Sequence, residues 1–365
     1  MNQDSINHTR TSYQPGVALD DLQLILTQTP PEVWVALRDQ RIFITGGTGF
    51  VGCWLLEALL WANEQLDLNL HLSVLSRDTA AFIAKAPHLA THRIVTLIQS
   101  DVTALDTING PFDSVIHAAT DVVKTGDDPI TTFDNIVQGT RATLALAQRA
   151  GATRYLLTSS GAVYGRQPAA VSHIAENYSG APDSLDIINA YGQGKRVSEW
   201  LAHNSGQQHN IQVKVARCFA LLGPYLPLDA HFAAGNFIRD GLNNRTIAIN
   251  GDGTSSRSYL YAADMTVWLL TMLINGRTQQ NYNLGSAHAI SIKALADTVS
   301  DIIYGENKVT IAQQPVANAT IQQYVPDVNK AQQELALAQY TDLPSAIQKT
   351  IVWEKRRRLL AAHNH

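Results

Sequence analysis

Short apolar runs alternate with longer helical patterns over the first part of this 365-residue chain. The runs at 41–45, 71–75, 95–98, 114–117, 154–158 and 212–216 predict strands. Between them, apolar residues recur at helical spacing, notably over 51–63, 131–150 and 190–204. Strands that are apolar on both faces and alternate with helices build parallel sheets covered on both sides. The pattern therefore predicts an α/β fold with a doubly wound parallel sheet.

A glycine-rich turn, Thr45-Gly46-Gly47-Thr48-Gly49-Phe50-Val51-Gly52, joins the first predicted strand to its helix. In a dinucleotide-binding turn, the first glycine allows a tight bend, the second lets the backbone approach a pyrophosphate, and the third lets helix pack on sheet. Free N–H groups at the helix N-terminus then hold the phosphates. The turn predicts a Rossmann-like domain for NAD(P), and its candidate contacts are Gly46, Thr48, Gly49, Phe50, Val51 and Gly52.

The second predicted strand ends in Ser76-Arg77, where an NAD-specific site usually carries an acidic residue. An arginine at this place can pair with the 2′-phosphate of NADP(H), although a surface arginine packed near the adenine is the alternative. We expect Ser76 and Arg77 to contact the cofactor, with NADP(H) slightly favoured over NAD.

A tyrosine and a lysine four residues apart, Tyr191 and Lys195, lie in the last of these helical patterns. They share one helix face, and a cation beside a phenol lowers the phenol pKa towards that of a general base. Ser160 closes Thr158-Ser159-Ser160 at the end of the fifth strand, where its hydroxyl can bridge a substrate and Tyr191. Tyr191, Lys195 and Ser160 are the predicted catalytic residues.

After residue 217 the alternation of strands and helices becomes irregular. The pattern along the whole chain predicts several segments. We expect a leader at 1–39 with one or two short helices, a dinucleotide-binding domain at 40–216, and a tail at 351–365. Residues 217–350 are expected to form mainly a smaller C-terminal α/β substrate-binding lobe, with segments around 255–275 returning to the first domain.

Composition and charge exclude several classes of partner. The net charge of −4 provides no basic field for nucleic acid or an anionic membrane, and no apolar run is long enough for a membrane span. Only Cys53 and Cys218 could form a disulfide, so we expect reduced thiols in a cytoplasmic protein. No metal is expected, because no His, Cys and Asp residues have metal-ligand spacing.

Together these motifs resemble the extended short-chain dehydrogenase/reductases, specifically the NAD-dependent epimerase/dehydratase family of nucleotide-sugar enzymes. The resemblance runs from about residue 40 to 340. It is carried by residues 45–52, Asp101-Val102, His117-Ala118-Ala119, Asn135, Gly139-Thr140, 159–165, Tyr191 with Lys195, Gly223-Pro224, 257–264 and 282–285.

The resemblance implies roles for residues that the spacing alone does not assign. Tyr191 would be the acid/base, Ser160 would hold the reacting sugar oxygen, and Lys195 would also bind the nicotinamide ribose. The substrate would be a nucleoside-diphosphate sugar, and a homodimer would form through a four-helix bundle of helices 131–150 and 190–204. Further cofactor contacts implied in this way are Asp101, Val102, Ala118, Ala119, Thr120, Cys218 and Phe219.

At two places the sequence departs from the family pattern, and these departures narrow the range of reactions expected of the protein. Family dehydratases carry Asp-Glu, and decarboxylases usually a glutamate, where this chain has Gly161-Ala162, which cannot transfer protons. The asparagine that usually contacts the substrate diphosphate is replaced by Ala220. Asn236 and Arg257 are candidate substrate ligands in its place, unless Asn236 is a helix N-cap and Arg257 a structural ion-pair partner of Asp264.

The sequence thus predicts an NAD(P)-dependent nucleotide-sugar epimerase that works through a transient keto-sugar. An NADPH-dependent nucleotide 4-keto-sugar reductase is the alternative, and it would consume added cofactor where an epimerase would not. A non-catalytic dinucleotide-sensing protein is disfavoured because Ser160, Tyr191 and Lys195 are all present. A 4,6-dehydratase is disfavoured by Gly161-Ala162.

Overall fold

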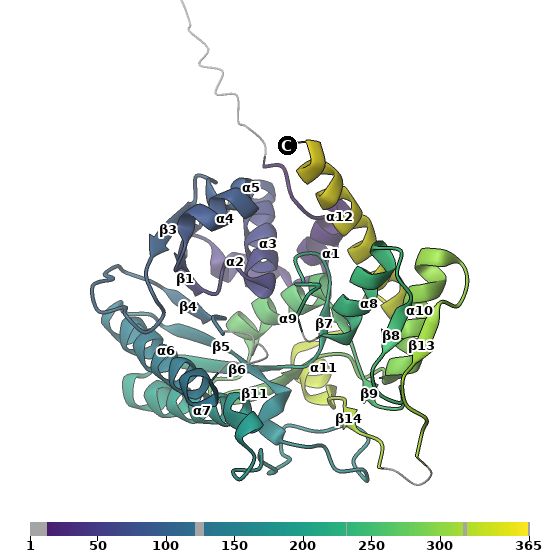
Figure 1. Cartoon of the computed structure of the whole chain (residues 1–365). Coiled ribbons are helices and arrows are strands. Elements are labelled where there is room, and N and C mark those ends of the chain that lie inside the picture. The colour runs from purple at the N-terminus through teal and green to yellow at the C-terminus, as the bar shows by residue number, and fades with distance from the viewer. Residues whose placement is uncertain (1–12, 121–127, 231, 317–319, 364–365) are drawn as a thin grey trace, which may run out of the picture.

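The computed structural model describes residues 13–120, 128–230, 232–316 and 320–363. Its central strands are β1 (Arg41–Thr45), β2 (His71–Ser76), β3 (Val95–Gln99), β4 (Ser114–His117), β5 (Arg154–Ser160), β6 (Gln212–Cys218) and β11 (Gln280–Leu284). They form a seven-stranded parallel sheet in the order β11-β6-β5-β4-β1-β2-β3 (Figure 1). The order reverses between β1 and β4, so the predicted doubly wound fold is confirmed.

Helices cover both faces of this sheet, and they include all of those predicted above. The helices are α1 (Leu19–Gln28), α2 (Pro31–Leu37), α3 (Phe50–Leu66), α4 (Thr79–Lys85), α5 (Pro87–Ala90), α6 (Pro129–Arg149), α7 (Ala190–His209), α8 (Ala233–Leu242), α9 (Ala262–Asn275), α10 (Ile292–Tyr304), α11 (Asn329–Leu335) and α12 (Leu343–His363), with short turns of 3-10 helix η1 (Gly161–Tyr164) and η2 (Ile187–Asn189). In Figure 1, α6 and α7 lie together on one side of the sheet, and α3 and α9 lie on the other.

The two faces of the sheet can be read from alternate residues of a single strand. In β1, Ile42 and Ile44 belong to the core cluster that includes α3 and α9, whereas Phe43 belongs to the cluster on the opposite face. All three side chains are fully buried. Because successive residues of a strand point to opposite faces, an apolar run such as β1 has two helical layers to pack against.

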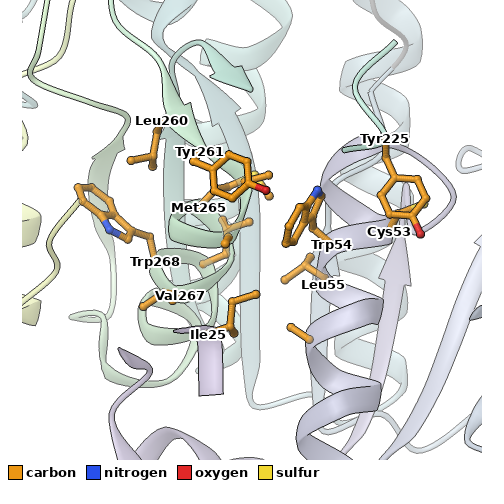
Figure 2. Close-up of a cluster of buried hydrophobic side chains, with 14 of the residues drawn as sticks. Ile25, Cys53, Trp54, Leu55, Tyr225, Leu260, Tyr261, Met265, Val267 and Trp268 are labelled. Atoms are coloured by element: carbon orange, nitrogen blue, oxygen red, sulfur yellow. The ribbon is translucent and has the colours of Figure 1, made fainter. Parts of the chain in front are cut away.

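The leader helices α1 and α2 pack into the same core as α3 and α9. Figure 2 shows Ile25 of α1 in this core. Trp54 of α3 meets the Tyr261 ring edge-on with centroids 5.7 Å apart, and its Nε1 donates to the Pro224 carbonyl at 2.8 Å. The Tyr261 hydroxyl donates to the buried Asp21 carboxylate of α1 at 2.7 Å. Residues 1–12 of the predicted leader lie outside the described ranges.

The C-terminal part adds small sheets to the large one. Its strands are β7 (Leu221–Leu222), β8 (Ile247–Ile249), β9 (Ser256–Arg257), β10 (Leu260–Tyr261), β12 (Ile290–Ser291), β13 (Val309–Ile311) and β14 (Gln323–Tyr324). They pair as β10-β7, β12-β9-β14 and β13-β8. Figure 1 places β8, β13, α8 and α10 together, beside the carboxyl end of the large sheet. The smaller C-terminal α/β lobe is therefore present as predicted.

Within the described ranges, no helix is long and apolar enough to cross a membrane.

Candidate active site

The glycine turn between β1 and α3 has the geometry of a phosphate cradle. Gly46 has φ +70°, and a Cβ there would lie 2.5 Å from the Ala118 carbonyl carbon. A Cβ at Gly52 would overlap the Gly46 carbonyl oxygen, so only glycine lets α3 approach β1 this closely. No side chain of the described residues caps α3 at Gly49, which leaves first-turn N–H groups to face a phosphate. The turn fits the predicted dinucleotide.

A cavity of about 230 Å³ lies beside this turn at the end of β2. The buried Ser76 and the exposed Arg77, the two residues predicted to contact the cofactor, line it. Lys85 of α4 also lines the cavity and donates to the Thr48 carbonyl at 2.7 Å, a basic residue that the sequence patterns did not single out. The Asp78 carboxylate accepts from the Ala81 N–H at 2.8 Å and caps α4.

The residues assigned to the dinucleotide by resemblance lie along the same edge of the sheet. The Ala118 and Ala119 N–H groups donate to the Thr45 carbonyl and hydroxyl at 3.2 and 3.1 Å, so the turn after β4 lies directly beside the glycine turn. The Asp101 carboxylate accepts from the Thr103 N–H and hydroxyl, and these hydrogen bonds hold the pKa of Asp101 below its usual range.

Lys195 is buried within α7 and is held by two oxygen atoms. Its Nζ donates to the Thr158 carbonyl at 2.8 Å and to Thr120 Oγ1 at 2.6 Å. The ammonium lies 5.9 Å from the centroid of the Tyr191 ring. Burial lowers the pKa of Lys195 to about 8, because the charged form loses hydration. The structure thus joins the predicted lysine and tyrosine to the end of β5.

Tyr191 and Ser160 face each other across the ends of α7 and β5. Burial raises the pKa of Tyr191 to about 12, while a hydrogen bond with the Ser160 hydroxyl lowers it in part. The expected lowering of the tyrosine pKa is therefore wrong for the protein alone, because loss of hydration on burial is the largest influence on this phenol. Ser160 is itself buried, and its Oγ accepts from the Ala162 N–H at 3.1 Å.

A third hydroxyl, that of Tyr324 in β14, lies beside Gly161 and donates to the Cys218 carbonyl at 3.5 Å, and no motif in the sequence had pointed to it. Its ring lies 4.6 Å from that of Phe219, which follows β6 and is buried. A Cβ at Gly161 would lie 2.6 Å from the Tyr324 hydroxyl oxygen and 2.7 Å from Phe219 Cζ. The two rings therefore occupy the space into which a side chain at position 161 would project.

A buried ion pair lies next to the predicted catalytic residues, and the sequence patterns did not predict it. The Arg217 guanidinium binds Glu199 of α7, with Nη2 to Oε2 at 2.7 Å and Nε to Oε1 at 3.0 Å. Glu199 also accepts from the Ser159 hydroxyl at 2.6 Å, and Arg217 donates to the Tyr164 hydroxyl at 2.9 Å. The pair ties α7 to β5 and β6 directly behind the predicted catalytic residues.

Both alternatives for the candidate substrate ligands are wrong. Asn236 lies inside α8 and accepts from Arg239 at 3.1 Å, so it is not a helix N-cap. Arg257 does not pair with Asp264, which instead accepts from the Tyr340 and Thr341 N–H groups. The Arg257 guanidinium carbon lies 5.9 Å from the centroid of the Tyr324 ring, which places the arginine beside the site.

His117 and Cys218, which flank the site, have no acid/base role in this arrangement. His117 is buried between the hydroxyls of Thr45 and Thr140, and burial lowers its pKa to about 3. Burial raises the pKa of the Cys218 thiol to about 12, so it stays protonated at neutral pH. In the part of the chain that the structure describes, no group of His, Cys, Asp and Glu side chains is placed to hold a metal ion.

Several proteins of known activity are similar to this chain. UDP-glucuronic acid decarboxylase 6 of Arabidopsis thaliana is 29% identical over 320 residues, which are 85% of this chain and 89% of that protein. UDP-glucuronic acid decarboxylase 1 of Danio rerio is 28% identical over 348 residues, which are 94% of this chain and 80% of the relative.

The fold is shared with solved nucleotide-sugar enzymes. The UDP-glucuronic acid 4-epimerase of Bacillus cereus, solved with UDP-glucuronic acid and NAD, superposes with a TM-score of 0.73 and 21% identity, over 87% of this chain and 99% of that one. The family model described as the NAD dependent epimerase/dehydratase family matches residues 42–285. This match covers more than half of the chain and agrees with the glycine turn and the Tyr191–Lys195 pair. The chain therefore belongs to the NAD dependent epimerase/dehydratase family of extended short-chain dehydrogenase/reductases.

Proposed function

We propose that the protein is an NAD(P)-dependent nucleotide-sugar epimerase that acts through a transient keto-sugar. The observation that carries this proposal is the meeting of Ser160, Tyr191 and Lys195 at the carboxyl end of β5, next to Gly161 and Ala162. Ser160 holds a sugar hydroxyl, and the Tyr191 oxygen takes its proton while Lys195 stabilises the phenolate. The nicotinamide supplies the hydride acceptor and later the donor.

Elimination of water would require a further acid and base beside this pair. Gly161 and Ala162 carry no ionisable group, and the rings of Tyr324 and Phe219 fill the space above Gly161. Epimerisation requires only that Tyr191 return the proton and that the hydride reach the opposite face of the keto-sugar. The residues present therefore support epimerisation over dehydration.

Decarboxylation of a nucleotide uronic acid is the second candidate. The decarboxylases to which the chain is similar favour it. Oxidation at the 4-position converts a uronic acid into a β-keto acid. This acid loses carbon dioxide to leave an enolate, and C5 of the enolate then takes up a proton from water. Arg257, beside Tyr324, is placed to attract the carboxylate by charge.

The basic side chains at the end of β2 favour NADP(H) as the cofactor. Arg77 and Lys85 line one cavity, and two cations around a ribose 2′-position match a phosphate better than a hydroxyl. This charge also supports the reductase alternative, since a 4-keto-sugar reductase consumes NADPH.

Mass spectrometry of the purified protein, followed by a screen of UDP-, GDP-, CDP- and dTDP-sugars and uronic acids, tests the proposal. An epimer formed without added cofactor supports the epimerase. Carbon dioxide with a pentose product identifies a decarboxylase, and stoichiometric NADPH consumption identifies a reductase. A Tyr191→Phe variant as active as the wild type would overturn the epimerase, the decarboxylase and the reductase proposals alike.

We further propose a cytoplasmic homodimer. Helices α6 and α7, the candidates for the four-helix bundle of a dimer, lie side by side. Ile130 of α6 and Trp200 of α7 are exposed to solvent. Light scattering of the purified protein tests the oligomeric state, and cell fractionation tests the location.

A further inference from the structure

The hydroxyl of Thr120, just after the end of β4, faces the ammonium of Lys195. The Lys195 Nζ donates to Thr120 Oγ1 at 2.6 Å and to the Thr158 carbonyl at 2.8 Å. Lys195 is only 3% exposed, so these two oxygens stand where water would hydrate an exposed ammonium. An ammonium has three N–H groups, and the third can be donated to the Tyr191 oxygen or to the cofactor.

The proton of the Thr120 hydroxyl points away from Lys195. Thr120 Oγ1 donates to the Ala119 carbonyl at 2.8 Å, so its lone pairs are what face the lysine. A hydroxyl in this orientation accepts from an ammonium, but it has no proton to offer to the lone pair of a neutral amine. A hydrogen bond made to the charged form of a group favours that form. The orientation of the Thr120 hydroxyl therefore favours a charged lysine.

The backbone that carries Thr120 is fixed to the strand that leads into the glycine turn. The Ala118 N–H donates to the Thr45 carbonyl at 3.2 Å, and the Ala119 N–H donates to the Thr45 hydroxyl at 3.1 Å. Thr45 is the last residue of β1 and directly precedes the glycine turn. Thr120 therefore cannot move away from Lys195 without disturbing contacts at the start of that turn.

We propose that Thr120 is a positioning residue of this active site, whose hydroxyl accepts from Lys195 and keeps that lysine charged beside Tyr191. The proposal rests on the proposed function, because it assigns a purpose to the same lysine and tyrosine. The ammonium lies 5.9 Å from the centroid of the Tyr191 ring, and a cation at this place stabilises the phenolate. Burial already lowers the pKa of Lys195, and loss of the Thr120 acceptor would lower it further.

The other described groups that act on the charge of this ammonium do not replace the threonine. On α7, Tyr191 is a neutral phenol at neutral pH, and Glu199 is bound by the Arg217 guanidinium, which compensates its charge. Cys218 of β6 is a neutral thiol at neutral pH, because burial raises its pKa to about 12. His117 of β4 is uncharged there too, because burial lowers its pKa to about 3. Hydrogen bonds to neutral oxygens therefore carry the stabilisation of the buried charge.

Lysine NMR of the purified protein, with the cofactor it retains and ¹⁵N at the lysine Nζ atoms, tests the proposal without a substrate. The signal of Lys195 is identified by its loss in Lys195→Arg, and its chemical shift is followed as the pH is raised. Thr120→Val keeps the shape of the side chain and should lower the titration midpoint of Lys195 by about one pH unit, because one hydrogen bond to a charged group is lost. Thr120→Ser, which keeps the hydroxyl, should restore the midpoint. A Thr120→Val protein with the wild-type midpoint would overturn the proposal.

Kinetics then connects the charge of Lys195 to the reaction. Thr120→Val should lower kcat/KM about three- to tenfold at neutral pH, as expected for the loss of one hydrogen bond that acts on the transition state. The pH at which kcat/KM stops rising should fall together with the midpoint measured by NMR, because both report the charge of Lys195. Thr120→Ser should restore the rate and the profile. An unshifted profile, or a loss of rate that Thr120→Ser does not restore, would contradict the proposal.

A matched variant distinguishes this role from a general loss of packing. Thr350→Val also removes a hydroxyl that donates to a backbone carbonyl, that of Ala346 at 2.7 Å, in a buried position of α12. Figure 1 places α12 far from α7, so the Lys195 midpoint and the pH profile should stay as in the wild type. A shift of equal size in Thr350→Val would overturn the assignment to Thr120. Should Thr120→Val fail to fold, Thr120→Ala takes its place with the same two measurements. A wild-type enzyme that converts no nucleotide sugar would refute the proposed function, while the NMR titration would still decide the role of Thr120.

Discussion

Lys195 donates a 2.8 Å hydrogen bond to the carbonyl of Thr158, so the cation of α7 is fixed to strand β5 just before Ser160. Burial shifts the pKa values of Lys195 and Tyr191 in opposite directions. The pKa of Lys195 is lowered to about 8 and that of Tyr191 is raised to about 12. The active combination, a charged lysine with an ionised tyrosine, is therefore a minor species at every pH.

This order of pKa values predicts the pH dependence of oxidation. Below pH 8 Lys195 stays charged, so kcat/KM should rise roughly tenfold per pH unit as the Tyr191 phenolate fraction grows. Above about pH 8 loss of the Lys195 charge offsets that gain, and the profile should become flat. Steady-state kinetics across this range measures it.

The Lys195→Arg variant provides the control for this profile. A guanidinium stays charged throughout, so the bend near pH 8 should disappear and the rise should continue. The absolute rate should be lower, because the longer side chain does not fit the Thr158 and Thr120 oxygens equally well. A bend at the same pH in both enzymes would assign it to another group.

The Arg217–Glu199 pair predicts a large effect on stability. Glu199→Gln should lower the free energy of unfolding by about 3–5 kcal/mol, since it leaves the guanidinium buried without a countercharge. Urea denaturation measures the loss. Asp297→Asn, which breaks an exposed pair with Lys293, is the matched control and should cost less than about 1 kcal/mol. Equal costs for the two variants would show that burial does not amplify the Glu199 interaction.

Most of the fold could be predicted from the sequence because its strands are apolar on both faces. The six predicted strands all belong to the large sheet. The seventh, β11, was missed because Gln280, Asn281 and Asn283 break the apolar run. Asn283 is nevertheless buried, and its side chain donates to the carbonyls of Ile174 and Asp327, so tertiary hydrogen bonds replace the missing hydrophobicity.

The candidate site could be predicted only where a motif is local in sequence. Tyr191 and Lys195 are four residues apart, and the glycine turn is continuous. Tyr324 lies more than a hundred residues from Ser160, in a two-residue strand that has no periodicity to detect. Its position beside Gly161 depends on the C-terminal lobe folding back over β5 and β6, and Glu199 and Arg217 likewise meet only in three dimensions.

A substitution at Gly161 tests how tightly the side chains of the site are packed. In Gly161→Ala the new Cβ would lie 2.6 Å from the Tyr324 oxygen and 2.7 Å from Phe219 Cζ. Because these rings pack on each other, we expect a loss of about 1–3 kcal/mol in stability and at least a roughly tenfold loss of activity. Gly251→Ala, where nothing described lies within 4 Å, should change stability by less than about 0.5 kcal/mol. A fully active Gly161→Ala enzyme would mean that the rings move aside freely.

The cavity at the end of β2 predicts the cofactor preference. Arg77→Asp should weaken NADP(H) binding about 10- to 100-fold, because it removes a charged partner of the 2′-phosphate and adds repulsion. Lys85→Met should weaken NADP(H) binding less, since Lys85 also donates to the Thr48 carbonyl. Neither variant should weaken NAD binding, because its ribose 2′-position carries a neutral hydroxyl. Titration calorimetry with both cofactors measures the two affinities, and Arg93→Met, on an exposed pair with Glu64, controls for lost surface charge. Tighter binding of NAD than of NADP by the wild type would overturn the preference, whatever the variants do.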